Sequence, residues 1–230
     1  MAAALRYGEI ALVGNKLNPN SVVVFSHGLG DTCAGWAGSF RALASRVPHA
    51  LFVLPTAPNQ PVTLNGGARM PSWYDIASFD TDGRREDGDG VLRSAQYILK
   101  LVDDQRTKFN IPPHRAVVGG FSQGAVISIA AGLTSPTKLA GVISVSGYVG
   151  GRLAIQALGE LQREVPIRMF HGKEDPMIPL QMSRGSRDLL TGLFKCKNVT
   201  HREYDGVGHG CNEPELDDVF AAIAELLPPL

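Results

Sequence analysis

Short runs of β-branched and apolar residues alternate along this chain with longer stretches whose apolar positions recur at helical spacing. This alternation is typical of a mostly parallel sheet with helices on both faces, and it predicts an α/β fold. We expect strands at Ser21–Ser26, Ala50–Leu54, Ala116–Phe121, Ala140–Ser146, Ile167–His171 and Thr200–Tyr204, with Glu9–Val13 as an antiparallel edge strand. We expect helices at Trp36–Arg46, Gly90–Phe109, Gln123–Leu133, Gln181–Phe194 and Pro214–Leu227.

The last predicted helix has the clearest boundary. Asn212 is suited to cap its N-terminus, Glu215 follows three residues later, and Pro214 is compatible with the first turn. Apolar residues between Leu216 and Leu227 recur on one face. This helix is therefore expected to pack on the sheet.

The segment from Ala57 to Asp89 does not follow the alternation. It is rich in proline and glycine, and a mixed charge cluster runs from Asp80 to its end. A long irregular stretch in a compact domain is usually a functional loop, a lid or a linker. It also contains apolar side chains that a linker does not need, namely Leu64, Met70, Trp73, Tyr74 and Phe79. We expect a folded loop on the sheet edge or over a site; the alternative is that the aromatic residues only anchor it.

Length, charge and composition narrow the class of protein. A chain of 230 residues suits a single domain, residues 1–230, with a sizeable core. Its 22 basic and 22 acidic residues give no net charge, which disfavours nucleic acid as a partner. No run approaches the roughly 20 apolar residues of a spanning helix, and the first residues lack the pattern of a secretory signal. We therefore expect a cytoplasmic chain without stable membrane insertion.

Metal and cofactor sites have little support. Cys33, Cys196 and Cys211 lack paired-ligand spacing, and no H-E-x-x-H motif is present. The glycines after Ser26 superficially match a dinucleotide fingerprint, but Cys33 stands where the third glycine belongs. The sequence therefore predicts neither metal nor cofactor, and it does not specify an oligomeric state.

Gly120-Phe121-Ser122-Gln123-Gly124 has the form G-x-S-x-G. A predicted strand precedes it and an apolar helix follows, which is the strand–turn–helix setting of a nucleophile elbow. The flanking glycines have a physical reason, because a sharp turn that raises the Ser122 hydroxyl above the sheet leaves no room for side chains beside it. We interpret Ser122 as a nucleophile; the alternative is a Gly-Ser turn without chemistry.

A serine nucleophile needs a base. In folds built on this elbow the chain order is Ser, then Asp or Glu, then His, so the base comes last. Three histidines follow Ser122. His171 precedes the acid candidates and is expected to pack or cap at a strand end, and His201 is expected to be an exposed strand residue. His209 lies in a glycine-rich loop before the last helix, where ligand sites of parallel sheets gather. We predict His209 as the base.

The acid that orients this base is predicted to be Asp175. It follows the strand that ends at His171, and Pro176 fixes its loop. Glu174 is expected to point elsewhere, and Asp205 is too close in sequence to His209 to come from a separate strand end. The alternative for Asp175 is a turn-capping aspartate.

The loop after the first parallel strand is expected to complete an oxyanion hole. In a hydrolase of this kind one N–H comes from that loop and the other from the residue after the nucleophile. These are the amides of Leu29 and Gln123, and Gly28 and Gly30 give the loop its freedom. The alternative is a tight strand–helix turn.

Sequence blocks spread over nearly the whole chain resemble the acyl-protein thioesterase (lysophospholipase/carboxylesterase) family. They are His27–Thr32, Pro55–Pro58, Pro61–Asn65, Met70–Asp75, Gly119–Gly124, Leu139–Val142, His171–Gly172 with Asp175–Pro176, and Leu226–Pro229. The resemblance implies an α/β-hydrolase fold. It also implies cleavage of the thioester on palmitoylated protein cysteines, and of lysophospholipids and small acyl esters.

The same resemblance implies site residues and a few departures. Ser122, Asp175 and His209 match the family triad, and Leu29 and Gln123 match its oxyanion hole. An acyl channel is implied beside the loop of Trp73 and at Met177 and Ile178. Ala2 stands where some relatives carry an acylated cysteine, and Ser146-Gly147-Tyr148 departs from the usual Ser-Cys/Gly-Trp, so the channel wall is expected to differ.

The sequence hypothesis is thus a serine hydrolase acting on S-acylated proteins or lysolipids. A general carboxylesterase or lysophospholipase with the same triad is the closest alternative. A non-catalytic ligand-binding module on a hydrolase fold is a minor one, because it predicts a damaged triad.

Overall fold

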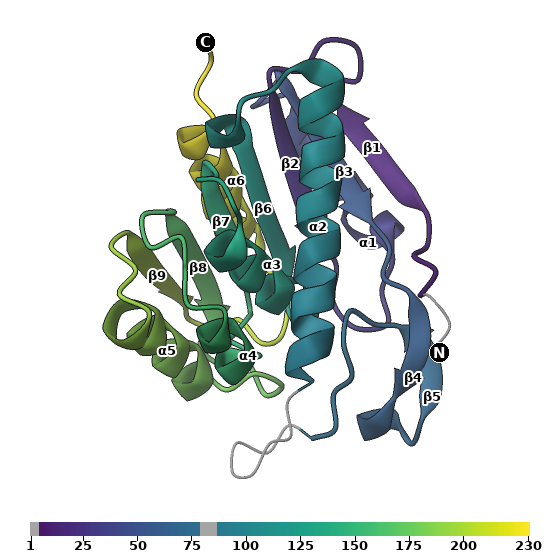
Figure 1. Ribbon diagram of the computed structural model, residues 1–230, viewed down its shortest axis with the longest axis vertical. Coiled ribbons are helices and arrows are strands. Elements are labelled where there is room, and N and C mark those ends of the chain that lie inside the picture. Colours follow the sequence, from purple (N-terminus) through teal and green to yellow (C-terminus); the bar gives the residue numbers. More distant parts are fainter. Residues whose placement is uncertain (1–4, 79–86) are drawn as a thin grey trace.

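The computed structural model describes residues 5–78 and 87–230, and within them one large sheet organises the chain (Figure 1). Its strand order is β1-β3-β2-β6-β7-β8-β9. The bounds are β1 Ile10–Gly14, β2 Ser21–Ser26, β3 Ala50–Pro55, β6 Ala116–Phe121, β7 Gly141–Val145, β8 Ile167–Gly172 and β9 Val199–Tyr204. Within this sheet, as far as residues 5–78 and 87–230 show, β1 is the one strand that pairs antiparallel, at the edge beside β3. The predicted parallel sheet and its antiparallel edge strand are confirmed.

Alternating side chains of the strands build a core on each face of the sheet. Val22 and Val24 of β2 pack on one side, and Val23 and Phe25 pack on the other. Because both faces are covered, β2 and β3 are buried along their whole lengths, which explains their continuous apolar runs.

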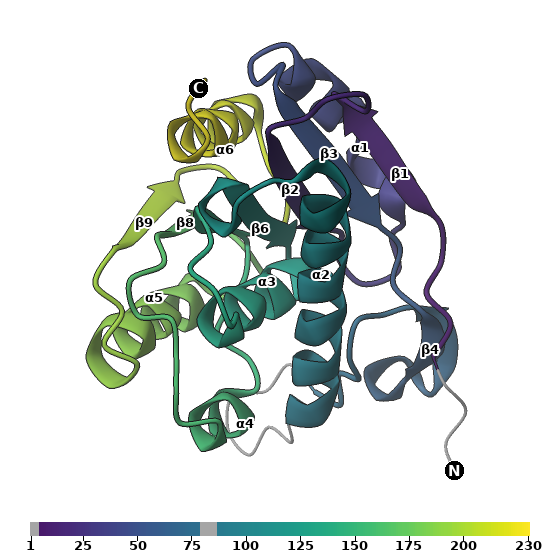
Figure 2. The ribbon, with the colours of Figure 1, turned by 45° about the horizontal axis from the view of Figure 1, so that its top comes forward.

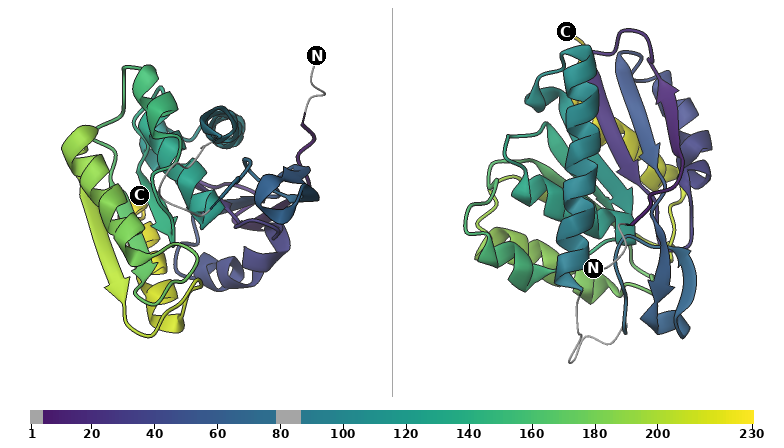
Figure 3. Two further views of the ribbon diagram at one scale, coloured as in Figure 1. Left: turned by 90° about the horizontal axis from the view of Figure 1, so that it is seen from below. Right: turned by 45° about the vertical axis from the view of Figure 1, so that its right-hand side comes forward.

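Helices cover the two faces unequally (Figures 2 and 3). α2, α3, α4 and α5 pack on the first face, whereas α1 and α6 pack on the second. Their bounds are α1 Cys33–Ala44, α2 Gly88–Phe109, α3 Gln123–Thr134, α4 Arg152–Ala157, α5 Leu180–Asp188 and α6 Glu213–Leu226; the short turns are η1 Thr63–Asn65, η2 Pro113–Arg115 and the π-helical η3 Leu189–Leu193.

The predicted helices differ from the observed ones mainly at their ends. α1 begins three residues earlier than expected because the Thr32 side chain caps it by accepting the Ala34 N–H. Asn212 caps α6 as predicted and accepts the Glu215 N–H at 2.9 Å. The six-residue α4 was not expected, since so short a helix leaves little periodicity to read.

The segment that broke the alternation contains a hairpin that sequence periodicity missed. β4, Asn59–Val62, pairs antiparallel with β5, Ala68–Pro71. Pro61 and Pro71 within these strands hide the pattern, because proline normally argues against a strand. The expected folded loop is confirmed for residues 57–78; Phe79 and much of the charged cluster lie outside the described residues.

None of the helices in the described ranges combines the length and apolar character required to cross a bilayer.

Candidate active site

The candidate residues gather at the carboxyl ends of the parallel strands. Ser122 follows β6, Leu29 follows β2, Asp175 follows β8 and His209 follows β9. The strands β2, β6, β7, β8 and β9 are neighbours in the sheet, so their ends converge although the residues are far apart in sequence. The structure thus brings these four residues to one edge of the sheet, as the sequence analysis expected.

Ser122 occupies a strained turn between β6 and α3. Its φ of 53° and ψ of −117° are rare for a residue with a side chain. The crossing backbones leave no space for a Cβ at either flanking glycine: at Gly120 it would lie 2.4 Å from the Gly124 carbonyl carbon, and at Gly124 it would lie 2.1 Å from the Ser26 carbonyl oxygen. The G-x-S-x-G spacing is therefore a packing requirement of the turn.

A continuous chain of hydrogen bonds links the serine to the acid. His209 Nε2 lies 2.9 Å from Ser122 Oγ, and His209 Nδ1 lies 2.7 Å from Asp175 Oδ2. The Asp175 carboxylate must accept from Nδ1–H, so the Nε2 atom is the acceptor for the serine hydroxyl. This is the tautomer that can remove the serine proton.

Asp175 is held ionised by its own loop. Its side chain is buried, and Oδ1 accepts the N–H groups of Met177 and Ile178, each at 2.8 Å. Burial raises the pKa of Asp175, but the hydrogen bonds from His209 and from these amides outweigh it and leave the pKa below its ordinary value. The other acids lie outside this arrangement: Glu174 is exposed, and Asp205 pairs with Lys173 at 2.7 Å.

The two amides predicted for an oxyanion hole are available. Among the described residues, neither the Leu29 N–H nor the Gln123 N–H donates to a protein acceptor, and both residues line the pocket that contains Ser122. The Gln123 amide also belongs to the first turn of α3, whose N-terminal end favours negative charge.

His27 fixes the direction of the Leu29 amide. The Ala57 N–H donates to His27 Nε2 at 3.0 Å, so the ring proton is on Nδ1, which donates to the Gly28 carbonyl at 2.6 Å. In a trans peptide the carbonyl and the next N–H point in opposite directions, so this bond turns the Leu29 N–H away from His27. Burial lowers the pKa of His27, which keeps the ring neutral. Sequence reasoning missed this role because it depends on contacts with a distant loop.

The loop of Trp73 borders the pocket as the resemblance implies, but Trp73 itself, which we expected to contact substrate, does not line it. Its side chain is fully buried, and its indole N–H donates to the His27 carbonyl at 2.8 Å. Its backbone N–H donates to Gln123 Oε1 at 2.8 Å, so it ties the loop to the elbow. The next residues of the same loop, Tyr74 and Ile76, line the pocket instead.

Met177 and Ile178 lie in the pocket as expected. The cavity in front of Ser122 has a volume of about 210 Å³, and it is lined mainly by apolar and aromatic side chains. Met177 is 42% exposed, whereas Ile178 is 3% exposed. Met177 therefore lies toward the mouth and Ile178 deeper inside.

The two remaining histidines after Ser122 do not contact the serine. His171 packs at the end of β8 as expected, and its Nε2–H donates to the Ile178 carbonyl at 2.8 Å. The expectation that His201 is exposed is wrong: its side chain is 2% exposed, because α5 covers this part of β9 and places Ser183 Oγ 2.9 Å from Nε2. Burial lowers the pKa of His201 to about 4. Among residues 5–78 and 87–230 no cluster of three or more metal-ligating side chains forms.

The parallel sheet, the strained elbow and the Ser–His–Asp hydrogen bonds together define an α/β-hydrolase. The chain belongs to the phospholipase/carboxylesterase family, whose model matches residues 8–227.

Comparison with known proteins agrees with this assignment. The chain is 38% identical to acyl-protein thioesterase 1 of Gibberella zeae over 221 residues, covering 91% of this chain and 92% of that protein. It is 40% identical to acyl-protein thioesterase 1 of Schizosaccharomyces pombe over 201 residues, covering 84% and 87%. Among solved structures, Arabidopsis thaliana SOBER1 superposes with a TM-score of 0.83 at 26% identity, covering 90% of this chain and 99% of that one. Zea mays acyl-protein thioesterase 2 gives 0.79 at 25% identity, with 96% and 100% covered.

Proposed function

We propose that this protein is a serine hydrolase that cleaves acyl thioesters of S-acylated protein cysteines and related acyl oxygen esters. The observation that carries the proposal is the unbroken hydrogen-bond chain from Asp175 through His209 to Ser122, beside an apolar pocket with two available amides.

The reaction follows from the geometry. His209 Nε2 takes the Ser122 proton as Oγ attacks the acyl carbonyl, and Asp175 stabilises the imidazolium that forms. The amides of Leu29 and Gln123 hold the negative oxygen of the tetrahedral intermediate. The imidazolium then protonates the leaving thiolate or alkoxide. Water activated by His209 attacks the acyl-enzyme and releases the carboxylic acid.

The choice of a thioester substrate rests on the relatives. Proteins named acyl-protein thioesterase 1 match most of this chain, and the pocket beside Ser122 is largely apolar, which suits an acyl chain. Lysolipids present the same combination of acyl chain and reactive carbonyl and are included as substrates. A cytoplasmic location stays a prediction, which fractionation of cells making a tagged chain would check.

Replacement of the nucleophile tests the proposal directly. Ser122→Ala should lower kcat for a p-nitrophenyl ester by about 10⁶-fold, because members of a triad act as a unit. It should also abolish labelling by a fluorophosphonate. Ser45→Ala is the matched control, since Ser45 is an exposed residue at the end of α1 whose hydroxyl bonds only locally. Full hydrolysis by Ser122→Ala would contradict the assignment, and wild-type protein that does not label would favour a ligand-binding module.

A substrate panel separates the thioesterase from a general carboxylesterase. Acyl thioesters and oxygen esters of the same chain length are compared on the wild type. The thioesterase proposal expects higher kcat/KM for an S-acylated peptide than for its O-acylated serine counterpart. A reversed order would identify a carboxylesterase.

A further inference from the structure

The cavity that contains Ser122 shares part of its wall, a partition of three side chains, with a second, much smaller cavity. Tyr74, Ile76 and Tyr148 line both spaces. The small cavity has a volume of about 10 Å³, which is at the threshold for one water molecule. It therefore has no room for an alkyl chain unless the partition moves.

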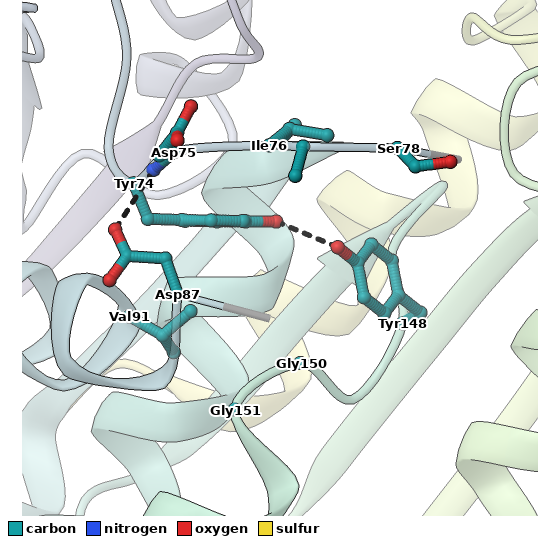
Figure 4. Close-up of a pocket in the computed structure, with 10 residues that line it drawn as sticks. Tyr74, Asp75, Ile76, Ser78, Asp87, Val91, Tyr148, Gly150 and Gly151 are labelled. Carbon is teal, nitrogen blue, oxygen red and sulfur yellow. Dashed lines mark hydrogen bonds between the residues drawn. The ribbon is translucent and has the colours of Figure 1, made fainter. Parts of the chain in front are cut away.

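The two tyrosines meet at their hydroxyl groups (Figure 4). Their phenolic oxygens lie 3.1 Å apart, and the side chains come from segments 74 residues apart in the sequence. The residues are only 4% and 7% exposed. The pair is thus a buried polar contact in the wall shared by the two cavities, and the rest of the Ser122 pocket is lined mainly by apolar and aromatic side chains.

Hydrogen bonds fix the backbone at or next to each of the two tyrosines. The Tyr74 carbonyl accepts hydrogen bonds from Gln123 Nε2 at 2.7 Å and from Ser72 Oγ at 2.6 Å. After Tyr148, the Val149 N–H donates to Ser186 Oγ at 2.8 Å. The backbone at both tyrosines is therefore tied to the elbow residue and to α5, so the rings can separate only by rotation of their side chains.

We propose that the Tyr74–Tyr148 pair closes the acyl pocket and sets an upper limit on the length of acyl chain that the enzyme accepts. This inference rests on the proposed function and specifies the substrate class of the same site. Acyl groups that end before the pair are preferred, and longer ones must turn back toward the mouth at Met177.

The energetics predict a break in the chain-length profile. Each methylene that enters the apolar pocket should raise kcat/KM roughly fourfold, the factor equivalent to burial of one CH₂ group. The gain stops where the chain reaches the tyrosines. Parting them breaks a buried hydrogen bond, for which an alkyl chain offers no replacement, and this costs roughly tenfold or more in binding.

The test is the dependence of kcat/KM on acyl length for a series of p-nitrophenyl esters from acetyl to palmitoyl, each profile normalised to that protein's own acetyl ester. Wild type should rise and then level off or fall before palmitoyl. Tyr148→Ala should join the two cavities and continue the rise over about two or more further methylenes, roughly fourfold for each. Ile76→Ala also thins the partition, because Ile76 lines both cavities, and it should move the break in the same direction.

Tyr97→Ala is the control, because Tyr97 lines neither cavity. Its profile should break where the wild type does. Fluorophosphonate labelling of Ser122 shows that each variant is folded at the active site. The proposal is overturned if the wild-type profile rises without interruption to palmitoyl, or if the labelled Tyr148 and Ile76 variants both break at the wild-type length. A wild-type protein that hydrolyses no ester and does not label would instead refute the proposed function, and this inference with it.

Discussion

The closest backbone approach in the active site gives the sharpest prediction. Gly124 is the second residue of α3, directly after the elbow, and a Cβ there would lie 2.1 Å from the Ser26 carbonyl oxygen and 2.7 Å from the His27 carbonyl oxygen. Both oxygens belong to backbone, which has no flexible end that could move aside. Gly124→Ala must therefore separate α3 from the loop that carries Leu29.

The size of this effect follows from the required displacement. Relief of the contact needs a shift of about 1 Å, and a misplacement of that size can cost about 10²-fold in rate. We expect kcat/KM to fall at least that far because the shift moves Ser122 relative to the Leu29 amide. Overpacking should also destabilise the fold by about 1–3 kcal/mol. For a chain of this size that corresponds to about 2–4 °C in Tm per kcal/mol.

The assay is ester hydrolysis together with thermal unfolding, and α5 supplies the matched control. At Gly185 an added Cβ meets nothing within 4 Å, and the residue is exposed in the helix. Gly185→Ala should keep wild-type activity and stabilise the protein by about 0.5–1 kcal/mol. If Gly124→Ala retains both the activity and the Tm of the wild type, the close packing of the elbow is refuted.

Three further substitutions test other parts of the site. Asp175→Asn should lower kcat by about 10⁴-fold because it no longer holds the required His209 tautomer, and steady-state kinetics would show this; an unchanged kcat would assign the orienting role elsewhere. His27→Ala should lower kcat by about 10²-fold with little change in KM, because the Leu29 amide is no longer directed at the oxyanion. Fluorophosphonate labelling of Ser122 in this variant would show that the site is folded, and an unchanged kcat would contradict the role of His27. Glu215 is fully buried, neither of its carboxylate oxygens has a hydrogen-bond partner among the described residues, and burial raises its pKa from 4.5 to about 7. The folded chain thus holds the Glu215 proton more tightly than the unfolded chain, so the free energy of unfolding should fall as the pH rises from about 4.5 through 7. In urea unfolding, Glu215→Gln should show a smaller fall over this pH range, and an equal fall in both proteins would contradict the prediction.

Local patterns identified most of the scaffold, because strand and helix periodicities depend on neighbouring residues. The parallel strands, the edge strand and the capped α6 were all predicted. The β4–β5 hairpin was missed, since its prolines are unfavourable in strands and its pairing partners lie in an irregular segment. His201 was misread for a related reason: its exposure depends on α5, which packs over β9 only in the folded chain.

The sequence by itself determined which residues form the triad and in which order they follow one another along the chain. The glycines around Ser122 and the loop positions of Asp175 and His209 have local causes, namely turn geometry and strand ends, which one stretch of chain can display. Tertiary structure alone decided which side chains face the substrate. Trp73 is buried whereas Tyr74 reaches the pocket, and Tyr74 meets Tyr148 across 74 residues of sequence. A pocket wall is a contact between distant segments, so its shape and the chain length it admits arise only when the sheet brings those segments together.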